Sequence, residues 1–315
     1  MVEQKKELVS VIIPTYKRSD TLKRAIDSVL NQTYPNIEII IVDDNANFLK
    51  TRDCNRELVK KYENIVFVEN ERNLGGGLSR NEGIQTAHGD FIAFLDDDDE
   101  YMPTKIEKQM QIFSSSENSK LAVVYCYANM INVNGSKYIY AKDIDGCPLL
   151  QNIENCIAPT SFWLCKKTAI EDVGCFEDIS SRQDASLLTK LFLNGYEISR
   201  VPEALLNYYW HDAAHGISKN SFKTVEAEKQ YREMFLKLSK NVDNKTRNEA
   251  LYCYSFRIAR EYTIIGERKK AYNELGNMLR HHIFDTKVYR IFATTFFNYT
   301  YRYCAGRKNR KRVGE

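Results

Sequence analysis

Short apolar segments alternate with helix-like segments over residues 8–95, and this alternation restricts the possible folds more than any other feature. The apolar segments are rich in valine and isoleucine, as buried strands are. The pattern predicts strands at residues 8–15, 37–44, 65–69 and 90–95 and helices at residues 19–32 and 78–87. Ser19 is the predicted N-cap of the first helix. The alternation therefore predicts an α/β fold with a mostly parallel sheet flanked by helices.

Polar or acidic residues follow three of the four predicted strands. These strand ends carry Pro14, Thr15 and Tyr16, then Asp43, Asp44 and Asn45, then the run Asp96–Asp99. In an open α/β sheet, ligands bind at the carboxyl ends of the strands. Capping of the following loop by Asp or Asn would explain one such end. Three together favour a binding site.

The side chains at these ends suit different parts of a nucleotide. A carboxylate after the second strand can accept a hydrogen bond from a base imide N–H or from sugar hydroxyls. Tyr16 offers a ring for base stacking, and Arg18 can pair with a phosphate. The aspartates of 96–98 suit a hard divalent cation, which takes oxygen ligands and bridges them to phosphates. The residues therefore predict a cation that holds a diphosphate.

Two other ion or phosphate motifs do not fit. A helix–loop–helix calcium site that starts at Asp96 needs glycine at its sixth position, where Tyr101 stands, and a strand precedes it. The glycine-rich stretch 73–81 lacks the Gly-Lys-Ser/Thr ending of a P-loop. We expect this stretch to supply turn geometry into the helix that carries Arg80 and Asn81.

Two stretches of the chain, residues 9–46 and 71–103, strongly resemble family 2 glycosyltransferases with the GT-A fold, which is Rossmann-like. The shared motifs are a strand ending in Pro-Thr-Tyr, a strand ending in Asp-Asp, an Arg-Asn pair in a helix and an Asp-x-Asp-Asp stretch. The resemblance is dense over residues 8–110 and continues thinly to about 218. It implies a nucleotide-diphosphate sugar as donor and Mn²⁺ or Mg²⁺ as cofactor.

The resemblance also implies a role for each motif residue. Those implied to bind the nucleotide sugar are Pro14, Thr15, Tyr16, Arg18, Asp43, Asp44, Arg80, Asp96 and Asp97. Among these, Asp96 and Asp97 would face the ribose and phosphates. Asp98 would bind the metal, and the four-aspartate run leaves that register open by one position.

A late helix is implied to carry the catalytic base. Family 2 enzymes commonly place this base in a Glu-Asp pair at the start of such a helix, and residues 182–195 fit the position. Asp184 takes the place of the base, while Gln183 stands where the family often has Glu. In an inverting transfer, that carboxylate would remove the proton of the acceptor hydroxyl. The alternative is an acidic first-turn residue that only favours the helix dipole.

Three aromatic or imidazole side chains are candidates for the second half of the site. Trp163 could stack on a sugar ring, although a buried strand aromatic is the more frequent arrangement. His211 and His215 follow a strand and could reach the phosphates or the metal, with His211 the candidate metal ligand. Structural roles are the more frequent outcome for single histidines.

The resemblance and the change of pattern predict two domains. The GT-A domain would span 1–218, with a nucleotide-sugar half at about 5–130 and an acceptor half at about 131–218. A helical C-terminal extension with a basic tail would span 219–315.

Charge is uneven along the chain. The net charge is +3, but residues 301–315 balance to +5 and the other 300 residues to −2. A mildly acidic body argues against nucleic acid as a partner. The aromatic and basic segment 287–315 predicts either contact with an anionic membrane surface or a packed helix with a solvated tail.

Signals for export and membrane insertion are not apparent. The first ten residues lack the apolar core of a secretion signal, and no apolar run is long enough to span a bilayer. The eight cysteines form no CxxC pair, so reduced thiols are expected rather than a zinc site or disulfides. The predicted location is the cytoplasm, including the inner face of the membrane.

Together these features predict a metal-dependent inverting glycosyltransferase that uses a UDP-sugar. Its acceptor would be a saccharide or a lipid-linked saccharide in cell-surface glycan synthesis. Two alternatives stay open at this stage. One is a sugar-nucleotide nucleotidyltransferase, which also clamps metals with paired carboxylates. The other is a catalytically inactive module that binds nucleotide sugars or glycans, to which Gln183 is the only pointer.

Overall fold

The computed structural model describes residues 6–210 and 222–279, together with positions 286, 289, 291 and 293. Its contacts divide the chain into two compact units. The sheet unit comprises residues 1–148, 157–178 and 183–211, and the helical unit comprises residues 149–156, 179–182 and 212–315. The predicted domain limits, with a boundary at 218, stay a prediction.

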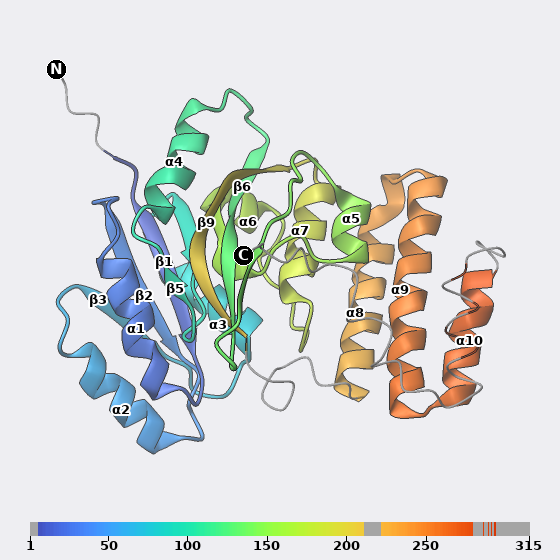
Figure 1. Cartoon of the computed structure of the whole chain (residues 1–315), viewed down its shortest axis with the longest axis horizontal. Coiled ribbons are helices and arrows are strands. Elements are labelled where there is room, and N and C mark those ends of the chain that lie inside the picture. The colour runs from blue at the N-terminus through green and yellow to red at the C-terminus, as the bar shows by residue number, and fades with distance from the viewer. Residues whose placement is uncertain are drawn as a thin grey trace. The chain divides into compact units, whose positions relative to one another are not determined.

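One sheet forms the centre of the sheet unit, and its first half is parallel (Figure 1). The strands β1 (Val9–Thr15), β2 (Ile37–Asp43), β3 (Ile65–Glu69) and β4 (Phe91–Phe94) lie in the order β3-β2-β1-β4. Thr15 pairs with Asp43, and Asp43 pairs with Glu69. The carboxyl ends of these strands therefore meet at one edge of the sheet, as the sequence predicted.

Mixed pairing continues the sheet beyond β4, in the order β4-β8-β6-β9-β5, with β7 paired to β6. These strands are β5 (Glu100–Tyr101), β6 (Leu121–Asn132), β7 (Lys137–Tyr140), β8 (Trp163–Lys166) and β9 (Glu197–Trp210). β6 and β9 run parallel, while the pairings of β8, β7 and β5 are antiparallel. The sheet is therefore mixed. The strand–helix alternation in the sequence predicted only its parallel first half.

Helices between the strands pack on the sheet. They are α1 (Ser19–Leu30), α2 (Leu49–Val59), α3 (Gly76–Thr86), α4 (Lys105–Ser115), α6 (Lys167–Asp172) and α7 (Gln183–Leu193), with the short 3₁₀ turn η1 (Thr160–Phe162). The predicted N-cap at Ser19 is wrong, because α1 begins at Ser19 and Arg18 occupies the cap position without a side-chain cap bond. The Arg18 side chain instead turns toward the acidic loop after β4.

The core of the sheet unit follows from the β-branched strands. Val11, Ile12 and Ile13 of β1 and Ile40 and Ile41 of β2 are all completely buried. Strands covered on both faces carry such continuous apolar runs because neither face meets water. Each fully buried valine or isoleucine contributes roughly 1.5–3 kcal/mol. This packing fixes the strand ends that carry the polar residues.

The helical unit contains α5 (Leu149–Glu154), α8 (Phe222–Leu238), η2 (Ser239–Asn241), α9 (Asn244–Ile265) and α10 (Arg268–Leu279). α9 packs against both α8 and α10, which flank it in Figure 1. Asp243 caps α9 by accepting a hydrogen bond of 3.0 Å from the Thr246 N–H, and Gly266 ends the helix in the left-handed conformation. This confirms a helical C-terminal extension.

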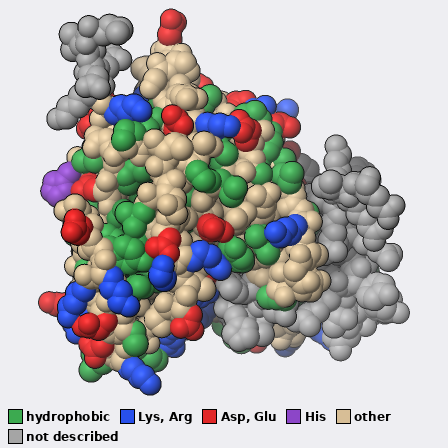
Figure 2. Space-filling model, turned by 60° about the vertical axis from the view of Figure 1, so that its left-hand side comes forward, with side chains coloured by type: hydrophobic (Ala, Val, Ile, Leu, Met, Phe, Trp, Pro, Cys, Tyr) green, Lys and Arg blue, Asp and Glu red, His purple; other side chains and the backbone are tan. Residues whose placement is uncertain are grey.

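Little of the aromatic and basic segment 287–315 lies within the described residues. At one described position, Ile291 is 1% exposed and joins a cluster with Tyr252, Ala259 and Leu275, as the packed-helix alternative requires there. Among the described helices, none combines the length and apolar character that crossing a bilayer demands. On the face seen in Figure 2, basic and acidic side chains are interspersed.

Candidate active site

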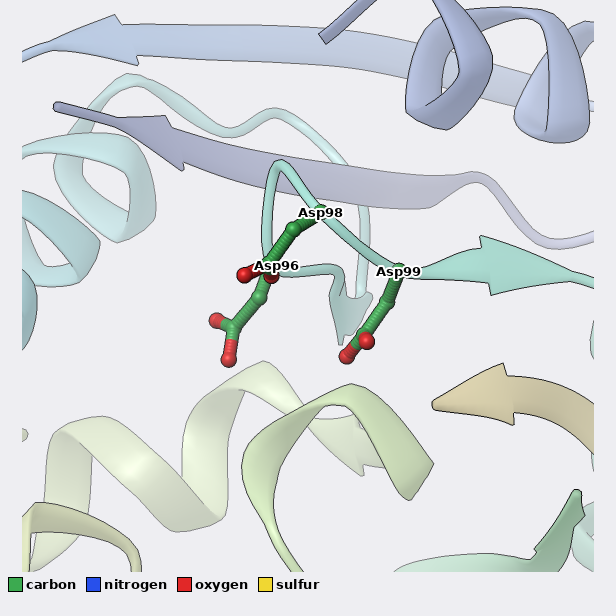
Figure 3. Close-up of side chains that lie close together, drawn as sticks. All are labelled: Asp96, Asp98 and Asp99. Atoms are coloured by element: carbon green, nitrogen blue, oxygen red, sulfur yellow. The ribbon is translucent and has the colours of Figure 1, made fainter. Parts of the chain in front are cut away.

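The loop that joins β4 to β5 brings three carboxylates together. One oxygen each from Asp96, Asp98 and Asp99 lies within 4.8 Å of the others. Figure 3 shows the three side chains extending to the same side of this loop. Three carboxylate oxygens at this spacing match the ligand preference of Mg²⁺ and Mn²⁺. We call these three residues the acidic cluster.

Asp99 is the most deeply buried member of the acidic cluster, at 1% exposure. Its Oδ1 accepts a hydrogen bond of 3.1 Å from the Tyr209 N–H, while its buried Oδ2 has no hydrogen-bond partner among the described residues. Burial, followed by the charges of Asp96 and Asp98, raises the pKa of Asp99 well above its usual value. A bound cation would remove both penalties, so the cluster fits a divalent metal.

Asp97 points away from the acidic cluster, toward the end of β1. Its Oδ2 accepts hydrogen bonds from Thr15 Oγ1 at 2.8 Å and from the Tyr16 N–H at 3.3 Å. Burial and the neighbouring Asp98 raise the pKa of Asp97 to about 7. Asp97 is therefore the one member of the run that points toward β1, and the metal-compatible set is Asp96, Asp98 and Asp99 rather than Asp98 alone.

Two arginines of the α1 region balance this negative charge. Arg18 Nη1 lies 3.3 Å from Asp97 Oδ1 and also contacts the carboxylate of Asp98. Arg24 donates to the backbone carbonyl of Asp98. Arg18 keeps 37% of its side chain exposed, so it can exchange a carboxylate for a phosphate of an incoming ligand.

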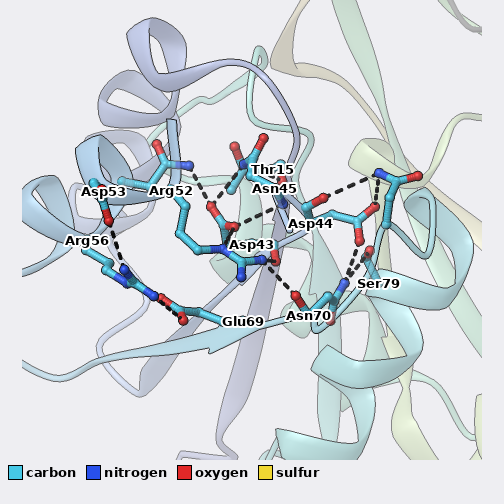
Figure 4. A network of polar contacts seen from close by, with 12 residues as sticks. Thr15, Asp43, Asp44, Asn45, Arg52, Asp53, Arg56, Glu69, Asn70 and Ser79 are labelled. Carbon is cyan, nitrogen blue, oxygen red and sulfur yellow. Dashed lines mark hydrogen bonds and ion pairs between the residues drawn. The ribbon is translucent and has the colours of Figure 1, made fainter. Parts of the chain in front are cut away.

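Asp43, at the end of β2, is completely buried, and protein donors saturate its carboxylate (Figure 4). Oδ1 accepts hydrogen bonds from the Asn45 N–H and Arg52 Nε, and Oδ2 accepts from the side chains of Asn45 and Asn55, all at 2.8–3.0 Å. Four donors fill the four lone-pair sites of a carboxylate. In this structure, Asp43 ties β2 to α2.

Asp44 is saturated in the same way, by the loop that precedes α3. Its oxygens accept hydrogen bonds from the side chains of Asn70 and Asn73 and from the N–H groups of Leu74 and Gly75, at 2.7–2.8 Å. A nucleobase N–H can reach this carboxylate only by displacing one of these donors. The predicted contact of Asp44 with the nucleoside remains a proposal.

The remaining residues predicted around the nucleoside lie at the end of β1. Pro14 is half-buried and pairs with Val42 of β2. Tyr16 is 40% exposed, and its ring meets Phe48 edge-on with centroids 5.6 Å apart. An exposed ring at a strand end leaves one face for a base to stack on.

Arg80 of α3 links the acidic cluster to α7. Its guanidinium donates to Asp96 and, over 3.2 Å, to Gln183 Oε1. The glycines before it make room for this approach, since a Cβ on Gly77 would stand 3.1 Å from Gln183 Cδ. The glycine-rich stretch therefore supplies close packing as well as the positive φ of Gly75, which is +79°.

Asp184 lies in the first turn of α7, half-buried, and accepts a hydrogen bond of 2.7 Å from the Ala185 N–H. Tyr208 of β9 interacts electrostatically with Asp184 as well as with the acidic cluster, although burial is the main cause of its strongly raised pKa. The sequence analysis did not single out Tyr208, which belongs to the Tyr-Tyr-Trp end of β9.

Of the other candidate residues, the structure describes Trp163 but not the two histidines. Trp163 is 1% exposed, and its Nε1 donates to the Ala158 carbonyl over 3.2 Å, so it is a buried strand aromatic. His211 and His215 lie outside the described residues. No disulfide joins the cysteines of the described part.

Comparison with known proteins places the chain in a family. The family model described as "Glycosyl transferase family 2" matches residues 10–174, about half of the chain. An uncharacterized glycosyltransferase of Methanocaldococcus jannaschii is 31% identical over 65% of this chain and 72% of its own. The putative teichuronic acid biosynthesis glycosyltransferase TuaG of Bacillus subtilis is 30% identical over 70% and 85%.

Solved structures share the fold. The crystal structure of S. aureus TarS 1–349 in complex with UDP-GlcNAc has a TM-score of 0.62 at 17% identity, covering 94% of this chain and 93% of that one. The mannosyltransferase PcManGT of Pyrobaculum calidifontis, in complex with GDP-Man and Mn²⁺, has a TM-score of 0.58 at 12% identity, covering 94% and 88%. The fold is thus that of a GT-A glycosyltransferase. The chain belongs to glycosyl transferase family 2.

Proposed function

We propose that the chain is a metal-dependent, inverting glycosyltransferase. It moves a hexosyl or N-acetylhexosaminyl group from a UDP-sugar to a saccharide or lipid-linked saccharide in cell-surface glycan synthesis. The acidic cluster carries this proposal, because three converging carboxylates, one of them with a buried oxygen that has no hydrogen-bond partner among the described residues, form a donor set that a divalent cation would complete. The names of TuaG and of TarS with its UDP-GlcNAc support the donor and the glycan class.

The metal ligands in this proposal are Asp96, Asp98 and Asp99, with Mn²⁺ or Mg²⁺ as the ion. A bound ion of this kind stabilises the negative charge that develops on the departing diphosphate. Arg18 and Arg80, which already pair with the aspartate run, neutralise the remaining phosphate charge. The Mn²⁺ complex of PcManGT supports this choice of metal. A role of His211 in the same site stays a proposal.

The donor's nucleoside would occupy the carboxyl ends of β1 and β2. There the exposed Tyr16 ring is available for stacking, and Thr15 and Asp97 form the wall toward the phosphates. Asp43 and Asp44 shape this wall through the loops that they hold. In this account they act mainly by positioning Asn45 and the loop around Asn73.

Asp184 would act as the general base on the acceptor. Its Oδ1 accepts one hydrogen bond, and its half-buried position leaves the carboxylate reachable by an acceptor hydroxyl. As that hydroxyl attacks the anomeric carbon, Asp184 takes its proton, and the bond to the diphosphate breaks on the opposite side. Gln183, whose Oε1 accepts from Arg80, holds the start of α7 in place.

A donor panel tests this proposal. UDP-glucose, UDP-galactose, UDP-GlcNAc, UDP-GalNAc and GDP-mannose are incubated with the protein, Mn²⁺ or Mg²⁺ and mixed saccharide acceptors, and nucleotide release is measured. We expect turnover of a UDP-sugar that stops with EDTA and in Asp98→Asn. Asp53→Asn is the matched control, because Asp53 is exposed and pairs only with Arg56 among the interactions seen.

Two results would contradict the proposal. Release of pyrophosphate from UTP and a sugar 1-phosphate would identify a nucleotidyltransferase. Metal-dependent UDP binding with no donor turned over would indicate an inactive binding module.

A further inference from the structure

Lys17 has a backbone conformation that lysine seldom adopts. Its φ is +60°, in the left-handed region that favours glycine. Lys17 lies in the short connection between β1, which ends at Thr15, and α1, which begins at Ser19. The residue is exposed, so burial does not hold it in this conformation. Another interaction must favour it, and strained backbone of this kind is found at ligand sites, where the surrounding structure maintains it.

Asn45 supplies that interaction. The Lys17 N–H donates a hydrogen bond of 2.8 Å to Asn45 Oδ1. Asn45 is completely buried, and its Nδ2 donates to Asp43 Oδ2 over 3.0 Å (Figure 4). The amide cannot be turned over, because its oxygen would then face the Asp43 carboxylate, which has no proton to donate when it is ionised. Asn45 therefore presents a fixed acceptor to the Lys17 N–H.

Consecutive N–H groups of this connection bond to two different strand ends. The Tyr16 N–H donates to Asp97 Oδ2 over 3.3 Å, in the loop after β4, whereas the Lys17 N–H bonds to Asn45, after β2. β1 lies between β2 and β4 in the sheet. The backbone is therefore held from both neighbouring strands directly before Arg18.

Arg18 carries the guanidinium that would meet the phosphates of the proposed donor. Its Nη1 lies 3.3 Å from Asp97 Oδ1 and also contacts Asp98, and 37% of the side chain is exposed, so a ligand can reach it. An arginine side chain loses much rotamer freedom when its guanidinium is held at one point. A backbone that already directs the side chain to that point lowers this cost and strengthens binding of the phosphates.

We propose that Lys17 and Asn45 are positioning residues for Arg18. The hydrogen bond to Asn45 holds the left-handed turn at Lys17, and the turn directs the Arg18 guanidinium to the diphosphate of the donor. The inference rests on the proposed function and adds to it the residues that order this arginine. It assigns no part in the turn to the Lys17 ammonium, which lies over the Phe48 ring.

Substitutions of Lys17 that differ chiefly in their tolerance of a positive φ test the inference. Lys17→Gly, Lys17→Ala and Lys17→Val all lack the ammonium, but glycine adopts the left-handed conformation freely, alanine less readily and valine least. UDP is titrated calorimetrically in Mn²⁺ into each variant. We expect the affinity to fall in that order, with Lys17→Val binding UDP about tenfold more weakly than Lys17→Gly. Lys17→Ala keeps the comparison available if Lys17→Val does not fold.

Two second substitutions test the route through Arg18 and Asn45. With Arg18→Ala added to both, the difference between Lys17→Gly and Lys17→Val should shrink to less than about twofold, because no guanidinium remains to be directed. Asn45→Ala should weaken UDP binding more in the wild-type protein than in Lys17→Gly, since glycine needs no hydrogen bond to hold the turn. The other effects of Asn45→Ala, through Asp43, are common to both proteins.

Lys61→Val is the matched control, because Lys61 is exposed and has no positive φ, and it should bind UDP as the wild-type protein does. Equal UDP affinity in the three Lys17 variants would overturn the inference. A difference among them that persists in full with Arg18→Ala would also overturn it, because the turn would then act by another route. Equal losses from Asn45→Ala in both proteins would refute the role of Asn45. A wild-type protein that does not bind UDP would instead refute the proposed function.

Discussion

Thr15 Oγ1 donates a hydrogen bond of 2.8 Å to Asp97 Oδ2, joining the end of β1 to the loop after β4. This bond turns Asp97 toward the nucleoside side and leaves its neighbours to converge on the other side. The direction of Asp97 is thus tied to a residue 82 positions away in sequence. The division of roles within Asp96–Asp99 follows from it.

Substitution of Asp99 should weaken metal binding much more than substitution of Asp97. Replacement of Asp99 by asparagine removes a charged oxygen from the acidic cluster, and Mn²⁺ affinity should fall by about 10- to 100-fold. Asp97→Asn keeps an oxygen for Thr15 and should change the Mn²⁺ affinity by less than about threefold. Electron paramagnetic resonance of Mn²⁺ in the presence of UDP measures both. Equal losses in the two variants would refute the assignment of ligands.

Asp184→Asn should abolish transfer but not donor binding. The amide cannot accept the acceptor's proton, so kcat should fall by about 10²- to 10⁴-fold. The asparagine oxygen can still accept from the Ala185 N–H, so α7 should keep its start. UDP affinity should stay within about twofold. Transfer rates and UDP calorimetry on the same preparation check this, and a kcat close to that of the wild type would remove Asp184 from the mechanism.

Replacement by alanine should lower the stability of the protein at one helical glycine and raise it at another. A Cβ on Gly83 of α3 would stand 2.4 Å from Ile12 Cγ2, and Ile12 is completely buried, so Gly83→Ala should destabilise the protein by about 1–3 kcal/mol. A Cβ on Gly276 of α10 meets no atom within 4 Å, so Gly276→Ala should stabilise α10 by about 0.5–1 kcal/mol. Urea unfolding measures both changes. If Gly83→Ala is as stable as the wild-type protein, α3 does not pack as closely on Ile12 of β1 as the structure indicates.

Lys105 should make stability depend on pH. It is completely buried, with its ammonium 4.0 Å from the Tyr101 ring centroid and 2.9 Å from Gln109 Oε1. Burial lowers its pKa from 10.5 to about 8, although Cys126 and Cys165 nearby act in the opposite direction. Between these pH values the unfolded chain holds a proton that the folded chain has released. The free energy of unfolding therefore rises with pH in this window, by up to ~1.4 kcal/mol per unit from this group.

The comparison with Lys105→Met tests that effect. Cys126, whose pKa burial raises to about 11, has the opposite influence above pH 9 and is present in both proteins. We expect the wild-type protein to gain stability relative to Lys105→Met as the pH rises from 8 to 10, by urea unfolding at each pH. Parallel curves for the two proteins would show that Lys105 titrates normally.

Local patterns in the sequence predicted the first half of the sheet well. The strands that became β1 to β4 are short β-branched runs with distinct ends, and the polar residues after them do meet at one edge. β6 and β9 were not delimited, because a strand in a mixed sheet with register shifts shows no clean period. The cap at Ser19 failed because Arg18 is drawn toward the acidic loop instead.

The site shows a different limit of sequence reasoning. Residue types and spacing predicted that acidic groups would gather, but they could not give the direction of each side chain. That direction depends on distant partners, such as Thr15 for Asp97 and the Gly75 loop for Asp44.

Calorimetric titration of UDP tests the central claim most directly. The wild-type protein is titrated in Mn²⁺, then in EDTA, and Asp98→Asn is titrated in Mn²⁺, with Asp53→Asn as the control. The account predicts that UDP binds the wild-type protein and Asp53→Asn alike in Mn²⁺. It predicts that affinity falls at least about tenfold both on chelation and in Asp98→Asn, since the metal joins the carboxylates to the diphosphate. UDP binding that is unaffected by EDTA and by Asp98→Asn would contradict a metal site at the acidic cluster.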